Sequence, residues 1–122
     1  MNDLESRQRD LAHRFGASFA VCPHDSKLGI ASGVAAGLWP LHGLRHPVTG
    51  STNGWYLWAG EELSEDPDFF APMHMWHLEA IRPEIIPYLG LAPGWRFLIA
   101  PDYEDVWYDR TLLIVDDSEP EA

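Results

Sequence analysis

Four histidines form pairs whose spacing suits metal coordination. His74 and His77 are three residues apart, and His42 and His46 are four apart. On a helix, either spacing places two imidazoles on one face, where they could bind a metal. Neither an H-E-x-x-H motif nor a second cysteine completes such a site. We therefore expect these histidines to be polar or partly buried, and we expect no cofactor. The alternative is an uncharacterised housekeeping domain, or a domain that binds a metal or small ligand through residues 42–77.

Other patterns of catalytic chemistry are incomplete. Cys22, the sole cysteine, lies in an apolar run and is expected to be a buried, unreactive thiol. The chain has no G-x-S-x-G motif, and the glycines of residues 29–37 are not followed by the lysine of a phosphate-binding loop. Paired acids such as Glu61 and Glu62 are better explained by a solvated acidic face than by acid–base catalysis. These patterns predict that the protein is not an enzyme.

Charge is distributed unevenly along the 122 residues, whose net charge is −11. Residues 1–60 carry five basic and four acidic side chains, whereas residues 61–122 carry three basic and fifteen acidic ones. An acidic surface repels nucleic acids and anionic membranes and speeds encounter with a basic protein. We therefore expect a protein partner, with no nucleic acid and no membrane. The first residues also lack an apolar signal core, so a cytoplasmic location is expected.

Helical and strand patterns predict the elements that must position these side chains. Residues 3–15 have the apolar spacing of an amphipathic helix that ends before Gly16. Strands are expected at residues 18–22, 54–59, 95–100 and 105–108, with a further one at 112–115. Residues 83–89 are typical of a short helix with proline in its first turn. The fold class is therefore α+β: a single domain with a mainly antiparallel sheet, an N-terminal helix and one or two short helices.

Two segments give weaker patterns. Residues 34–39 are compatible with a strand, followed by a loop between Pro40 and Pro47. Residues 73–81 fit either a short helix or a strand entering one. The acidic tail, residues 116–122, is expected to be disordered because it has nothing to bury.

Aromatic residues alternate along the strand at residues 54–59. Since side chains point alternately to the two faces of a sheet, Trp55 and Leu57 should share one face, and Tyr56 and Trp58 the other. Either helices cover both faces, or one face is a binding surface. Trp55 and Trp95 each follow a glycine at the start of a strand, and we expect both in the core.

One stretch of the chain resembles a known bacterial domain family. Residues 54–62 fit its pattern G-W-x-[FILV]-x-[AS]-G-[DE]-E, and Asp66 and Pro67 fit the D-P segment that follows. Residues 83–89 match P-x-I-[IL]-P-[YL]-L, and the final strand begins at residue 94. This family is the thirty-third class of predicted immunity proteins of polymorphic toxin systems, formerly a domain of unknown function. The resemblance implies an immunity-protein-like α+β domain over residues 17–115, which residues 1–16 join as an N-terminal helix.

The resemblance also implies a function. An immunity protein binds a cognate toxin, and an acidic partner would suit a basic nuclease. The family offers no catalytic residues, so the binding surface is predicted from charge and aromatic content, in a monomer or weak homodimer. The candidate partner-binding residues are Glu61, Glu62, Glu65, Asp66, Asp68, Asp102, Glu104, Asp105, Asp109, Tyr56 and Trp58. The two acidic loops follow two aromatic strands, so they meet at one end of the sheet only if those strands are parallel.

Overall fold

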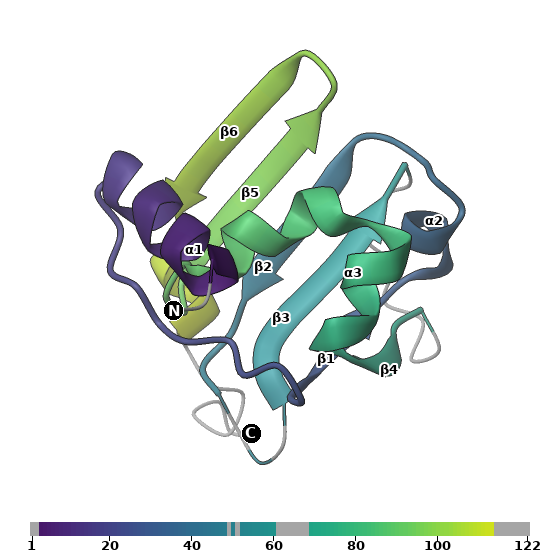
Figure 1. The fold of residues 1–122 in the computed structure, drawn as a ribbon, viewed down its shortest axis with the longest axis horizontal. Helices are drawn as coiled ribbons and strands as arrows, with labels where there is room; N and C mark the ends of the chain where they lie inside the picture. The colour runs from purple at the N-terminus through teal and green to yellow at the C-terminus, as the bar shows by residue number, and fades with distance from the viewer. Residues whose placement is uncertain (1–2, 49, 51, 61–68, 114–122) are drawn as a thin grey trace.

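The computed structural model describes residues 3–48, 50, 52–60 and 69–113. It combines an N-terminal helix, a sheet and several short helices, which confirms the predicted α+β domain (Figure 1). The expected disorder of residues 116–122 lies outside the described residues.

The sheet has six strands in the order β4-β1-β3-β2-β5-β6. Four of its neighbouring pairs are antiparallel, and β1 and β3 are parallel. The strands are β1 (Lys27–Ile30), β2 (Leu41–Arg45), β3 (Thr52–Ala59), β4 (Ala71–His74), β5 (Trp95–Ala100) and β6 (Tyr103–Tyr108).

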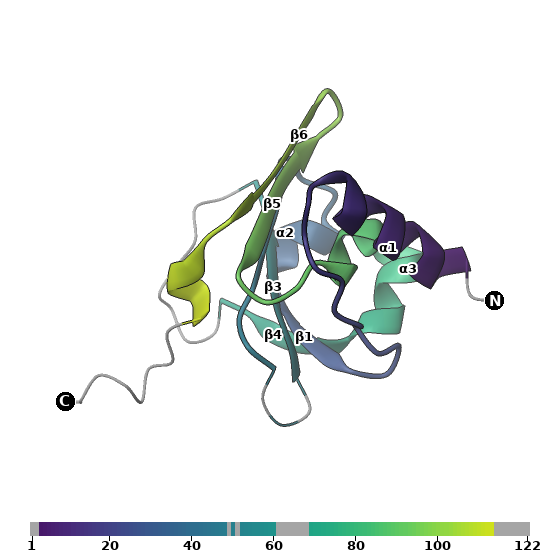
Figure 2. The ribbon, with the colours of Figure 1, turned by 90° about the vertical axis from the view of Figure 1, so that its left-hand side faces the viewer.

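Helices cover one face of this sheet. Figure 2 shows α1 (Asp3–Arg14) and α3 (Leu78–Ile81) on one side and the last described segment on the other. The 3-10 helix η2 (Pro83–Gly90) packs beside α1. The remaining short elements are α2 (Ser32–Ala35), η1 (Met75–His77) and η3 (Arg110–Leu113).

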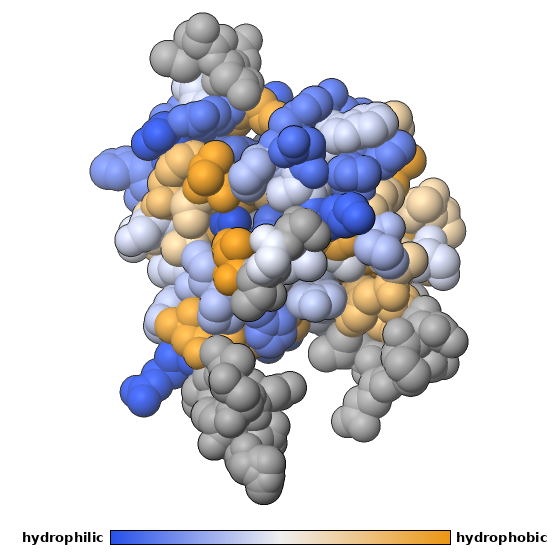
Figure 3. Space-filling view, turned by 90° about the horizontal axis from the view of Figure 1, so that it is seen from below, coloured by the Kyte–Doolittle hydropathy of each residue, from blue (hydrophilic) through white to orange (hydrophobic). Residues whose placement is uncertain are grey.

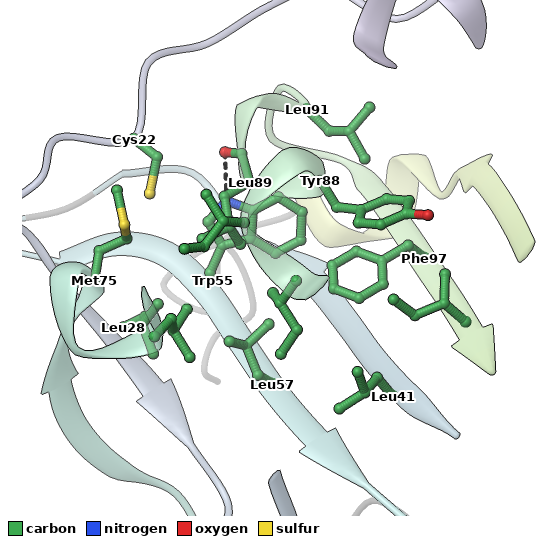
Figure 4. Packing of buried hydrophobic residues seen from close by; sticks show 14 of the residues in the cluster. Cys22, Leu28, Leu41, Trp55, Leu57, Met75, Tyr88, Leu89, Leu91 and Phe97 are labelled. Carbon is green, nitrogen blue, oxygen red and sulfur yellow. Dashed lines mark hydrogen bonds between the residues drawn. The ribbon is translucent and has the colours of Figure 1, made fainter. Parts of the chain in front are cut away.

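The main core lies between the sheet and the helical layer. Trp55 and Leu57 are fully buried there with Leu41, Phe97 and Leu89 (Figure 4). The Trp55 indole nitrogen donates a hydrogen bond to the Leu89 carbonyl at 3.0 Å. The expected core position of Trp55 is therefore confirmed, whereas Trp95 is only partly buried, at the margin of this core.

A smaller apolar cluster covers part of the other face. Trp58 is buried there with Ala31, Leu44 and Leu112, and Tyr56, Phe69 and Phe70 pack around them. The predicted alternation of Trp55 and Leu57 against Tyr56 and Trp58 is therefore confirmed.

The expected strand at residues 18–22 is wrong. Only Phe19 forms an isolated bridge, with Leu91. The buried Arg45 side chain instead donates hydrogen bonds to the carbonyls of Ala20 and Val21, at 2.9 and 3.0 Å. These backbone groups therefore find partners without a neighbouring strand.

The region between Ala31 and Pro47 also differs from expectation. Residues 32–35 form α2 instead of part of a strand, and the expected loop contains β2, an inner strand of the sheet. A Cβ atom on Gly43 would lie 2.3 Å from the Phe97 ring, so this strand needs its glycine. That contact is between strands and cannot be read from local sequence.

The segments after β3 agree only in part with expectation. Residues 110–113 form the 3-10 helix η3, so the strand expected at 112–115 is wrong over its described part. Residues 71–81 form a strand that enters a helix, as one of the two interpretations predicted. The helix expected at residues 83–89 is present as η2, which is a 3-10 helix.

Candidate partner-binding surface

β3 and β5 are parallel, because both are antiparallel to β2, which lies between them. Leu41, at the start of β2, pairs with Ala59 on one side and with Ile99 on the other. The chain therefore leaves both aromatic strands at the same end of the sheet. Five of the predicted binding residues come after β3 in the sequence and lie outside the described residues: Glu61, Glu62, Glu65, Asp66 and Asp68.

The second group of predicted acids does not form one patch. Asp102 lies in the turn between β5 and β6. Glu104 pairs with the core residue Ile99, so its side chain is on the helix-covered face, whereas Asp105 is on the other face. Asp109 lies beyond the opposite end of β6, where its backbone N–H donates to Gly94.

Glu104 holds the edge of the sheet against the helices. Its carboxylate accepts hydrogen bonds from Arg14 of α1, at 2.8 Å, and from the hydroxyl of Tyr88 in η2. Burial, together with this neighbouring carboxylate, raises the pKa of Tyr88. A substitution of Glu104 would therefore disturb packing as well as surface charge.

Asp109 is also tied into the fold. Its carboxylate accepts hydrogen bonds from the Thr111 hydroxyl and from Arg96, at 2.5 and 3.2 Å. The bond from Thr111 contributes most to lowering the pKa of Asp109, and Arg96 adds to it. This residue caps the turn into η3 and lies far along β6 from Asp102.

Tyr56 and Trp58 lie on the face away from the main helical layer. Trp58 is only 3% exposed, and its ring stacks on His42 with centroids 4.9 Å apart. Tyr56 is partly buried and contacts Phe70 edge to face. Trp58 therefore supports the second apolar cluster and presents little surface to a partner.

A groove of about 480 Å³ opens at the sheet end where β5 finishes, and we call it the end groove. Two of its acids are among the residues predicted from the sequence. The residues that complete it were not predicted, because they come from η2, from the adjoining ends of β5 and β6, and from the connection before β2. Trp39 precedes β2 and is 38% exposed, and Tyr103 is 54% exposed. The polar and aromatic lining consists of Trp39, Glu84, Tyr88, Asp102, Tyr103 and Glu104.

Arg82 positions Trp39 at this groove. The Arg82 side chain is buried and donates hydrogen bonds to the carbonyls of Val34 and Leu38, at 3.0 and 3.1 Å. Its guanidinium lies 4.6 Å from the centre of the Trp39 ring. A large aromatic ring is thereby held at the surface by a buried cation.

The opposite end of the sheet has a different surface. Seen from that end, hydrophobic residues form small patches separated by hydrophilic ones (Figure 3). A second groove of about 430 Å³ opens beside Val21, Asp25 and Asn53, and none of the described residues that line it is aromatic. The combination of carboxylates and aromatic rings therefore distinguishes the end groove from this second groove.

The Imm33-like domain family matches residues 7–109, a span from α1 to the end of β6. This chain belongs to the Imm33-like domain family. No curated protein and no solved structure gives a significant match.

The two predicted histidine pairs of this Imm33-like domain lie in separate parts of the structure. His42 and His46 are on β2 and directly after it, whereas His74 and His77 flank Trp76 at the end of β4. Within the described part of the chain, no group of three or more histidine, cysteine or acidic side chains could hold a metal ion.

No described helix of this Imm33-like domain is long and apolar enough to cross a membrane.

Proposed function

We propose that this protein is an immunity protein that binds and neutralises a cognate bacterial toxin. Membership of the Imm33-like domain family is the observation that carries the proposal, because the match spans nearly all of the described fold. The protein acts by binding and not by catalysis. It works in the cytoplasm, as a monomer or weak homodimer.

The proposed binding surface is the acidic and aromatic end of the sheet. Asp102 and Asp105 are exposed at or near the β5–β6 turn, and the acidic sequence after β3 leaves from the same end. Such a surface complements a basic protein, so a nuclease with a cationic nucleic-acid groove suits it. Its charge would accelerate association, and nearby aromatic rings would supply affinity. Glu61, Glu62, Glu65, Asp66 and Asp68 remain part of this proposal.

The test is protection of cells that express a candidate toxin, chosen from the genes that neighbour the gene for this chain. Co-expression of the intact chain should restore growth, and the purified pair should form a complex. If neither happens with the neighbouring toxin, the immunity proposal is wrong for this chain.

Charge reversal then tests the surface. The double variant Asp102→Lys and Asp105→Lys should slow association with the toxin by about tenfold and weaken its dependence on salt. The single variants Asp102→Lys and Asp25→Lys change the net charge equally, and Asp25→Lys, at the opposite end of the sheet, should slow association much less than Asp102→Lys. Glu104 is left unchanged because it bonds to Arg14 and Tyr88. Unchanged association of the double variant would exclude this end of the sheet as the docking surface.

A further inference from the structure

We propose that the end groove binds an arginine side chain of the partner protein. This inference rests on the proposed function and specifies the chemistry of the contact. The groove lies where β5 turns into β6, and Trp39 and two residues of η2 are among its walls. Its volume of about 480 Å³ falls in the range of roughly 300–1,000 Å³ typical of pockets for small ligands, which leaves room for one long side chain.

The carboxylates of the groove are unequally neutralised. Glu104 pairs with Arg14 at 2.8 Å, and the Arg82 guanidinium is 3.8 Å from Glu84. Asp102 has no ion-pair partner within the described chain, and it is exposed. Three carboxylates therefore face two cations, which leaves a negative charge centred on Asp102 for an incoming cation.

Aromatic rings determine which cation fits best. The exposed rings of Trp39 and Tyr103 offer flat surfaces beside the free carboxylate. The Arg82 guanidinium already lies over the Trp39 ring, 4.6 Å from its centre, so an incoming guanidinium would stack on the other face of Trp39 or on the ring of Tyr103. Arginine can stack on a ring and form two parallel hydrogen bonds to a carboxylate, whereas lysine offers only a compact charge.

The buried partners make the groove rigid. Arg82 is 5% exposed and holds the chain before Trp39 through two carbonyls, and Tyr88 is 9% exposed and holds Glu104. A preformed groove loses little side-chain entropy when it is occupied. An arginine inserted there would therefore act as an anchor of the interface, a role in which arginine is enriched.

Titration of the intact protein with N-acetyl-arginine amide tests this chemistry directly. The indole N–H signal of Trp39, identified by its loss in Trp39→Phe, should shift saturably in a nitrogen-correlated NMR spectrum. N-acetyl-citrulline amide has nearly the same shape without the charge and should cause no saturable shift. An absent shift with the arginine probe, or an equal shift with the citrulline probe, overturns the inference.

Two variants locate the binding. Asp102→Asn should weaken arginine binding by about tenfold, since it removes the negative charge of the acceptor and leaves only a neutral amide. Asp25→Asn removes the same charge at the other groove and should bind the arginine probe normally. Equal weakening by both variants would show a general charge effect and would overturn the assignment to the end groove.

Toxin binding, measured in parallel, separates this inference from the proposed function. If the toxin binds but the arginine probe does not, the arginine inference fails while the immunity function stands. If the arginine probe binds at Trp39 but the neighbouring toxin does not, the groove chemistry stands and the immunity proposal fails.

Discussion

The Trp55 indole nitrogen donates a hydrogen bond to the carbonyl of Leu89, 3.0 Å away. The same carbonyl accepts a bond from the buried Arg45 guanidinium at 3.3 Å. Trp55 lies on β3 and Leu89 on η2, so this contact joins the sheet to the helical layer (Figure 4). The largest side chain of the core thus has its only polar atom satisfied.

Truncation of Trp55 to alanine should lower the free energy of unfolding by about 3–5 kcal/mol, because a large cavity replaces a fully buried ring. Trp95→Ala should cost clearly less, since Trp95 is only partly buried. Urea unfolding of both variants provides the measurement. Equal losses would contradict the burial difference between the two rings.

Replacement of Arg45 by lysine should destabilise the protein by at least about 3 kcal/mol. The Arg45 guanidinium donates to five backbone carbonyls, and an ammonium with three donors would leave buried acceptors unsatisfied, at about 1–3 kcal/mol each. Arg7→Lys, on the exposed surface of α1, is the control and should leave the unfolding midpoint unchanged. Tolerance of Arg45→Lys would show that these carbonyls find other partners.

Gly54→Ala should be more damaging than Gly16→Ala. Both glycines have positive φ, at +89° and +72°, but a Cβ on Gly54 would lie 2.0 Å from the His46 carbonyl oxygen. Nothing lies within 4 Å of a Cβ on Gly16. We expect Gly16→Ala to lower the free energy of unfolding by about 1 kcal/mol through backbone strain, and Gly54→Ala to lower it by about 1–3 kcal/mol more because of the added clash. Thermal and urea unfolding provide the measurement. Similar losses at both positions would mean that the His46 carbonyl moves aside.

Stability should fall as pH drops below neutrality, in part through His42. Burial, together with the nearby charge of Arg96, lowers the pKa of His42, so the unfolded chain binds a proton more readily than the folded one. The stabilising effect of neutral His42 is present above the unfolded pKa of about 6.5 and is lost as pH falls through the folded pKa. His42→Gln should reduce the loss of unfolding free energy between about pH 7.5 and about pH 5. An unchanged pH dependence in His42→Gln would exclude this contribution.

Cys22 should resist alkylation in the folded protein. Burial raises the pKa of Cys22 to about 11, and the thiolate is the reactive form. At about pH 8, iodoacetamide should therefore react on the order of 100-fold more slowly with native protein than with protein in urea. A cysteine at the adjacent exposed position, Val21→Cys with Cys22→Ser, is the control and should react rapidly without denaturant. Equal rates for native and control proteins would show that the core opens readily around Cys22.

Much of the fold could be predicted because its features are local. The alternation of Trp55, Tyr56, Leu57 and Trp58 has the period of a strand, and that period sends side chains to opposite faces whatever lies around them. The N-terminal helix was predicted for the same kind of reason, since apolar residues recur at helical spacing.

The inner strand β2 could not be predicted in this way. Its five residues include Gly43 and the charged Arg45, which individually disfavour a buried strand. Gly43 is required by the Phe97 ring above it. Arg45 is accepted in the core because five carbonyls surround it, four of them from segments at least 24 residues away. Both reasons lie in partners at long sequence separation.

The acidic second half of the chain, its aromatic strands and the acids that follow those strands can all be recognised from local sequence. The arrangement of those residues in space depends on contacts between strands that are far apart in the chain. Insertion of β2 between β3 and β5 makes the two aromatic strands parallel and brings their ends together, while strand alternation separates Glu104 from Asp105. Trp39, Glu84 and Asp102 are distant in sequence but line the same end groove. Their proximity depends on the order of the strands in the sheet, and no local sequence pattern encodes that order.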